Sequence, residues 1–122
     1  MIYLTLDDAL TVVERVGFVV RDRDLLEGCL GRPMATAFGE DAYPGIADKA
    51  AALLEAINRS HPLIDGNKRL SWICMLLFLR SNGSDLVSAV DDSESFVLAV
   101  ANGDLTLDEI ADWISGHIFE LG

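Results

Sequence analysis

The residues best suited to chemistry in this chain lie in one short run, from His61 to Arg69. The run contains an imidazole, a carboxylate, an amide and two cations, and it leads directly into the apolar segment 70–79. A helix that begins here offers unpaired backbone N–H groups and the positive end of its dipole to an anion, and Gly66 lets that anion approach the backbone closely. The pattern therefore predicts a phosphate-binding site at the start of a helix.

Each polar side chain of the run has a candidate role. His61 is the candidate general base or acid, because imidazole titrates near working pH. Asp65 either caps the helix or binds Mg²⁺, which favours hard carboxylate oxygens beside phosphate, and the sequence leaves both roles open. Asn67 can donate to a phosphate oxygen or orient the loop. Lys68 and Arg69 are expected to bind phosphate, and Arg69 is favoured because its planar fork can hold two oxygens.

The elements that position this run are predicted to be helices. No alternating strand pattern persists, so the fold class is all-α, with about six helices. Caps, stops and apolar periodicity place them near 5–17, 24–31, 44–59, 66–81, 92–103 and 106–118. The helix after the chemical run is apolar on almost every side, which predicts a central position. Segment 32–43 lacks helical periodicity and is expected to be a loop or small hairpin, and segment 84–92 is expected to be the loosest part.

Composition limits the classes of function. A chain of 122 residues with 51% hydrophobic content fits a single domain, 1–122. Its net charge of −11 leaves no broad basic surface, so no direct nucleic-acid partner is expected. No secretion signal or bilayer-spanning segment is recognised, which favours a cytoplasmic protein without a membrane partner. Cys29 and Cys74 match no metal-ligand spacing and are expected to be buried free thiols.

Residues 61–69 resemble the signature of the Fic/Doc superfamily, and specifically its death-on-curing (Doc) branch. Every specified place of the signature matches except Leu63, which stands where the superfamily has Phe. The resemblance extends over most of residues 1–83. Leu70 and Ser71 replace the usual Thr-Ala pair after the signature Arg. The resemblance implies a Fic fold, a compact helical bundle with a short flap between its second and third helices.

The resemblance also implies roles for individual residues. His61 would be the base acting on a hydroxyl of a target protein, and Asp65 would hold Mg²⁺. Gly66, Asn67, Lys68 and Arg69 would form the phosphate cradle for ATP. A flap in segment 32–43 would align the target chain by adding backbone hydrogen bonds. Its docking residues would be Arg32, Met34, Thr36, Phe38 and Tyr43.

Lys68 discriminates between two reactions within the superfamily. Adenylylating Fic enzymes usually have Gly at this place and a second Arg where this chain has Trp72. Both differences point to the Doc branch, which transfers the γ-phosphate of ATP to a threonine of elongation factor Tu and stops translation. The expected partner is an antitoxin of the Phd type. The alternatives are an adenylyltransferase and a catalytically weak antitoxin-binding module, for which Leu63 is the only support.

Overall fold

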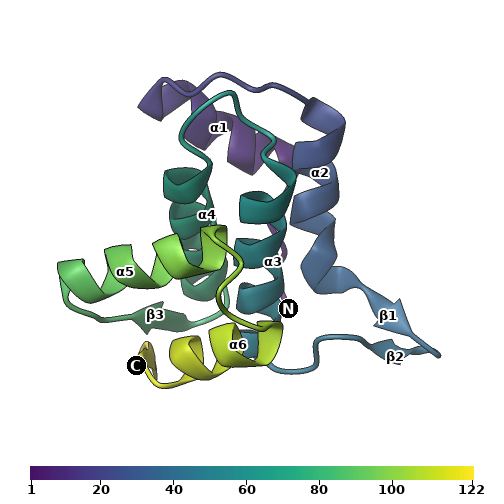
Figure 1. Cartoon of the computed structure of the whole chain (residues 1–122). Coiled ribbons are helices and arrows are strands. Elements are labelled where there is room, and N and C mark those ends of the chain that lie inside the picture. Colours follow the sequence, from purple (N-terminus) through teal and green to yellow (C-terminus); the bar gives the residue numbers. More distant parts are fainter.

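Two long helices, α3 (Ile46–Ser60) and α4 (Asn67–Ser81), lie side by side at the centre of the molecule (Figure 1). In this computed structural model, which describes residues 1–122, α3 packs most extensively on α4 and α6. Consecutive small residues of α3, from Ala50 to Ala52, are completely buried and let the neighbouring helices approach closely. The apolar helix α4 is central, as its sequence predicts, because no side of it is polar enough to face water throughout.

The all-α prediction is confirmed, with six α-helices arranged as a mostly helical bundle. The four outer helices are α1 (Leu6–Val16), α2 (Arg23–Gly31), α5 (Val90–Ala101) and α6 (Leu107–Ser115). Capping boxes at Thr5 and Thr106 begin α1 and α6, as the sequence indicates. Helices α5 and α6 are joined by a stacked pair, Phe96 and Trp113, whose ring centroids lie 3.8 Å apart.

Two expectations for the C-terminal third are wrong. Segment 84–92 is not loose, because β3 (Ser84–Leu86) pairs with the last strand, β4 (Ile118–Glu120), and α5 already begins at Val90. The last helix ends at Ser115 and does not reach residue 118. The reason is tertiary: the two short strands satisfy each other's backbone groups, and local propensity gives no sign of a partner so far along the chain.

The segment between α2 and α3 is a small hairpin, as expected. A 3₁₀ turn, η1 (Arg32–Met34), leads to β1 (Thr36–Ala37) and β2 (Glu40–Asp41), and the hairpin projects away from the helices (Figure 1). Its base is anchored by Lys49 of α3, a buried lysine whose Nζ lies 3.2 Å from Asp41 Oδ2 and 3.3 Å from the carbonyl oxygen of Pro33. The hairpin is therefore fixed at its root and free at its tip.

None of the helices combines the length and the apolar character that a bilayer crossing requires.

The two cysteines are free and buried, as predicted. Burial raises the pKa of the Cys74 thiol to about 12, with a further contribution from Cys29, whose own pKa is raised chiefly by burial. The folded protein therefore keeps protons that the unfolded chain releases above the ordinary pKa of 9.0. We expect stability to fall as pH rises above that value, because unfolding then releases protons.

A thiol-labelling time course tests whether Cys29 and Cys74 are buried and protonated in the native protein. Neither cysteine should react with Ellman's reagent in the native protein at mildly alkaline pH, and both should react once urea unfolds the chain. Rapid labelling of the native protein would contradict the buried, protonated state of these thiols.

Candidate phosphate-binding site

The loop between the two central helices begins and ends in left-handed backbone. His61 caps the end of α3 with φ 52°, and its N–H donates to the carbonyl oxygen of Ile57 at 3.1 Å. Gly66 has φ 90° and precedes the first residue of α4. A left-handed conformation is uncommon for a residue other than glycine and is maintained only where surrounding contacts enforce it. The contacts that hold this loop therefore decide where the His61 ring lies.

The side chain of Asn67 holds the loop from inside. Its Oδ1 accepts from the N–H of Leu63 at 2.9 Å, and its Nδ2 donates to the carbonyl oxygen of Leu63 at 3.1 Å. The amide thus forms both hydrogen bonds that a neighbouring strand would form with that residue. Of the two roles open to Asn67, loop orientation is the one seen in this structure. The Leu63 side chain is buried in the core, where the superfamily signature has Phe.

A second segment, residues 18–22, holds the same loop from outside. The N–H of Ile64 donates to the carbonyl oxygen of Val19 at 3.0 Å, and the N–H of Arg21 donates to that of Pro62 at 2.8 Å. Together they form an antiparallel bridge between the connection after α1 and the signature loop. Sequence analysis missed this pairing, because a single bridge leaves no periodic pattern.

Arg21 also binds the end of α3 through its side chain. Its Nε donates to the carbonyl oxygen of His61 at 2.9 Å, and one terminal nitrogen donates to that of Ser60 at 3.0 Å. A cation at a helix C-terminus complements the dipole and satisfies carbonyls that the helix leaves unpaired. Arg21 is therefore a positioning residue for His61, and no motif in the sequence points to it.

The Phe18 ring lies against Gly66 and Arg69, two residues of the phosphate cradle. A Cβ atom added to Gly66 would lie 2.6 Å from Cδ1 of Phe18, so only glycine fits at this place. The guanidinium carbon of Arg69 lies 5.5 Å from the centroid of the same ring, within range of a cation–π contact. The ring therefore both requires Gly66 and supports Arg69. Phe18 is a further residue that sequence analysis missed.

The structure brings the six residues of the predicted chemical site to one cavity of about 360 Å³. Besides those six, it is lined by Asn58, Ile64 and Ala101. Asp65 does not cap α4: its Oδ1 accepts from the N–H of Gly66 at 2.8 Å, and α4 has no side-chain cap. The first N–H groups of α4 are therefore open to an anion.

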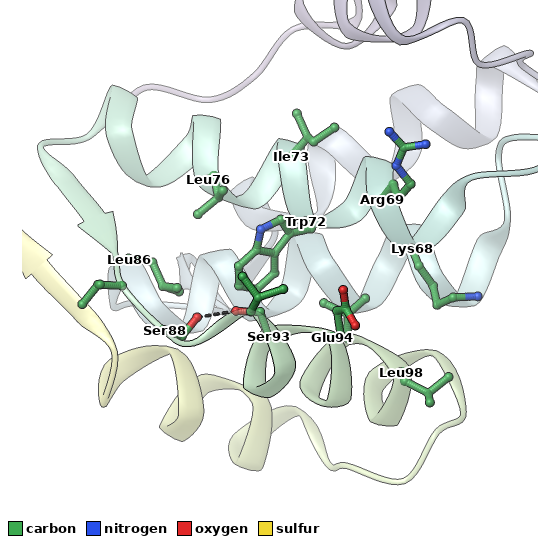
Figure 2. A pocket seen from close by; sticks show the side chains of 13 residues that line it. Lys68, Arg69, Trp72, Ile73, Leu76, Leu86, Ser88, Ser93, Glu94 and Leu98 are labelled. Atoms are coloured by element: carbon green, nitrogen blue, oxygen red, sulfur yellow. Dashed lines mark hydrogen bonds between the residues drawn. The ribbon is translucent and has the colours of Figure 1, made fainter.

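The two cations at the start of α4 are also available to a ligand. Neither Lys68 nor Arg69 forms an ion pair with a carboxylate of this chain, whereas Arg32, Lys49, Arg59 and Arg80 each do. In Figure 2 both side chains extend from the first turn of α4 at one end of a larger groove. The unpaired cations and the uncapped N–H groups can bind phosphate. The exposed imidazole of His61 can accept a proton from a nearby hydroxyl.

The expected docking residues of the flap do not line this cavity. Arg32, Met34, Thr36, Phe38 and Tyr43 lie in or beside the hairpin, which precedes α3, whereas His61 follows α3. The helix between them has 15 residues and is therefore about 22 Å long. Arg32 donates to the Tyr43 hydroxyl at 2.8 Å and pairs with Glu55, so these two residues support the hairpin. Phe38, at the tip, is fully exposed with φ 54°.

Comparison with known proteins identifies the class to which this fold and site belong. Residues 3–79, which include the whole loop and most of α4, match the Fic/DOC family, and the chain belongs to that family. Among its relatives is Toxin Doc of Mycolicibacterium smegmatis, which is 46% identical over 99 residues. That alignment covers 80% of this chain and 76% of the relative.

Replacing Gly66 with alanine tests the packing of the cradle. Left-handed strain and the collision with Phe18 should together lower the free energy of unfolding by about 2 to 4 kcal/mol, measured by urea denaturation. Gly83→Ala is the matched control, because Gly83 has φ 83° but open space around its Cβ position, and it should cost only about 1 kcal/mol. Equal losses in the two variants would contradict the proposed contact with Phe18.

Proposed function

We propose that this protein is the toxin of a toxin–antitoxin module and a protein kinase. It transfers the γ-phosphate of ATP to a Thr or Ser hydroxyl of a translation factor in the cytoplasm, and elongation factor Tu is the foremost candidate. Membership of the Fic/DOC family and the relative named Toxin Doc support a toxin. Lys68, at a place where adenylylating Fic enzymes have Gly, supports phosphate transfer over AMP transfer.

The observation that carries the proposal is the convergence of three groups on one cavity. The exposed imidazole of His61 lies at the end of α3, and the uncapped N–H groups and free cations lie at the start of α4. The loop between them is bonded on both sides, so the imidazole and the anion site keep a fixed relation. Such preorganisation is the main contribution a protein makes to phosphoryl transfer.

In the reaction, His61 accepts the proton of the target hydroxyl as its oxygen attacks the γ-phosphorus. The bond from that phosphorus to the bridging oxygen breaks, and ADP leaves with the electron pair. Lys68 and Arg69 stabilise the charge that spreads over the phosphoryl oxygens, together with the N–H groups of α4. Arg69 is held by the Phe18 ring and is suited to bind two oxygens at once.

Asp65 is the residue that would hold Mg²⁺. Its carboxylate lines the cavity, and Oδ1 is bonded to the N–H of Gly66, which fixes the group beside the cradle. No cluster of three His, Cys, Asp or Glu side chains suited to a metal is present. A single carboxylate fits Mg²⁺, which commonly takes its remaining ligands from substrate phosphates and water. The ion would neutralise phosphate charge.

The rival functions receive less support. Adenylylation uses the same cavity but does not explain Lys68. A weak binding module is argued only from Leu63, and this side chain is buried while its backbone is bonded to Asn67 and bridged to Val20. The loop therefore remains fixed, although Leu63 is smaller than the Phe of the superfamily signature.

A groove beside the cavity is suited to the proposed antitoxin. It has a volume of about 720 Å³ and runs between α4 and the segment from β3 through α5 (Figure 2). Its walls are mainly apolar, with Trp72, Ile73 and Leu76 on one side and Val97 and Leu98 on the other. Lys68 and Arg69 line both the groove and the cavity. A Phd-like segment folding into this groove would cover the two cations that the reaction needs.

The test is the intact mass of purified elongation factor Tu after incubation with the protein, ATP and Mg²⁺. We expect a gain of one phosphate and no gain with His61→Ala, because the variant lacks the base. Gly83→Ala serves as the control for a backbone change remote from the cavity. A gain of one AMP would overturn the interpretation of Lys68. No gain with the wild-type protein would exclude this target.

A further inference from the structure

Asn58 is a buried polar residue in the wall of the cavity that none of the roles above uses. It lies in the last turn of α3, is only 3% exposed and lines the cavity with His61, Asp65 and Lys68. Its Oδ1 has no hydrogen-bond partner in the protein, the single such buried side-chain atom in the molecule. Buried acceptors in folded proteins are nearly always hydrogen-bonded. An unpaired acceptor on a residue that lines a cavity therefore indicates a ligand group that donates a hydrogen bond.

The orientation of this amide is fixed by a chain of hydrogen bonds. The Ser71 hydroxyl donates to the carbonyl oxygen of Lys68 at 2.7 Å, so its oxygen must act as an acceptor toward Asn58. Nδ2 of Asn58 donates to that oxygen at 2.8 Å and to the carbonyl oxygen of Leu54 at 2.9 Å. Both amide hydrogens are therefore occupied, and the group cannot be turned around without losing two hydrogen bonds. Oδ1 is therefore the one polar atom of this side chain that has no partner in the protein.

Ser71 thereby acquires a role. It stands where the superfamily usually has Ala, and its hydroxyl joins the last turn of α3 to the first turn of α4. The pair holds a neutral acceptor in the same cavity as Lys68, Arg69 and the uncapped N–H groups, which attract anions. Phosphate oxygens are predominantly deprotonated and act as acceptors at neutral pH, so a second acceptor such as Asn58 Oδ1 is not suited to bind the phosphate chain itself. A donor hydrogen must come from another part of the ligand.

We propose that Asn58 is a ligand-binding residue that distinguishes a nucleotide from free polyphosphate. Its Oδ1 accepts a hydrogen bond from a hydroxyl or amino group of the nucleoside while Lys68 and Arg69 bind the phosphates. This inference rests on the proposed use of ATP, and it adds a specificity determinant that the signature does not include. A polar site of this kind discriminates strongly because an analogue without the donor leaves the acceptor unpaired.

Asn58→Leu is the variant of choice, because it keeps the branched shape of the side chain, removes the acceptor and leaves no other polar group without a partner. Ser71 keeps its bond to the Lys68 carbonyl, and the Leu54 carbonyl keeps its place in the helix. Ser71→Ala is the matched control: it breaks the same link between α3 and α4 but retains Oδ1, and the hydrogen bond from Nδ2 to the Leu54 carbonyl oxygen still orients the amide. Asn58→Ala provides a second variant should the leucine prevent folding.

The experiment is calorimetric titration of each variant with Mg²⁺-ATP and with Mg²⁺-tripolyphosphate. We expect Asn58→Leu to bind ATP about tenfold more weakly and tripolyphosphate as well as wild type does. Ser71→Ala should weaken ATP binding less than Asn58→Leu does, because Oδ1 is retained and still oriented through Leu54, and it should bind tripolyphosphate as wild type does. Equal weakening for both ligands, equal weakening in Ser71→Ala, or no weakening in either Asn58 variant would overturn the proposal. Failure of the wild-type protein to bind ATP would instead overturn the proposed function.

Discussion

The paired hydrogen bonds between the Asn67 amide and the backbone of Leu63 are the constraint on which the site depends. They fix a short loop between the two central helices by bonding one of its residues from the first turn of α4. Segment 18–22 completes the same loop from its other side. The end of α3, which carries His61, and the start of α4, which carries Lys68 and Arg69, therefore keep a fixed separation while both remain open to solvent.

Several features of this region lower stability and lie together around one cavity. α4 begins without a side-chain cap, although capping boxes begin α1 and α6. His61 adopts a left-handed conformation, and Oδ1 of Asn58 is buried without a partner. Each feature costs on the order of 1 kcal/mol or more in an ordinary domain. Their concentration around one cavity is typical of a site that a ligand completes.

The sequence predicts much of this arrangement because the relevant signals are local. Capping boxes, apolar periodicity and stop residues give the helices, and the short run from His61 to Arg69 gives the residues of the cavity. The pairing of β3 with β4, the bridge between Val20 and Leu63, and the ring of Phe18 beneath Gly66 were not predictable. Each joins segments far apart in the chain through one or a few contacts, and such contacts leave no periodic pattern.

The hairpin shows where resemblance and geometry differ. The superfamily pattern assigns segment 32–43 to target alignment, and none of its expected docking residues lines the cavity that contains His61. The hairpin is nevertheless firmly held, through Lys49 to Asp41 and through Arg32 to Tyr43, and it presents an exposed aromatic side chain at its tip.

The most direct test of the account is an NMR titration of the ¹⁵N-labelled protein with ATP and Mg²⁺, in which the backbone amide signals are followed. We expect the largest shifts at residues 66–69, the uncapped start of α4, and no change in the amide signals at the start of α5. α5 also begins without a side-chain cap, but it has acidic residues in its first turn, so it is the internal control. Shifts centred on α5 or on the hairpin, with none at residues 66–69, would contradict the assignment of the phosphate site.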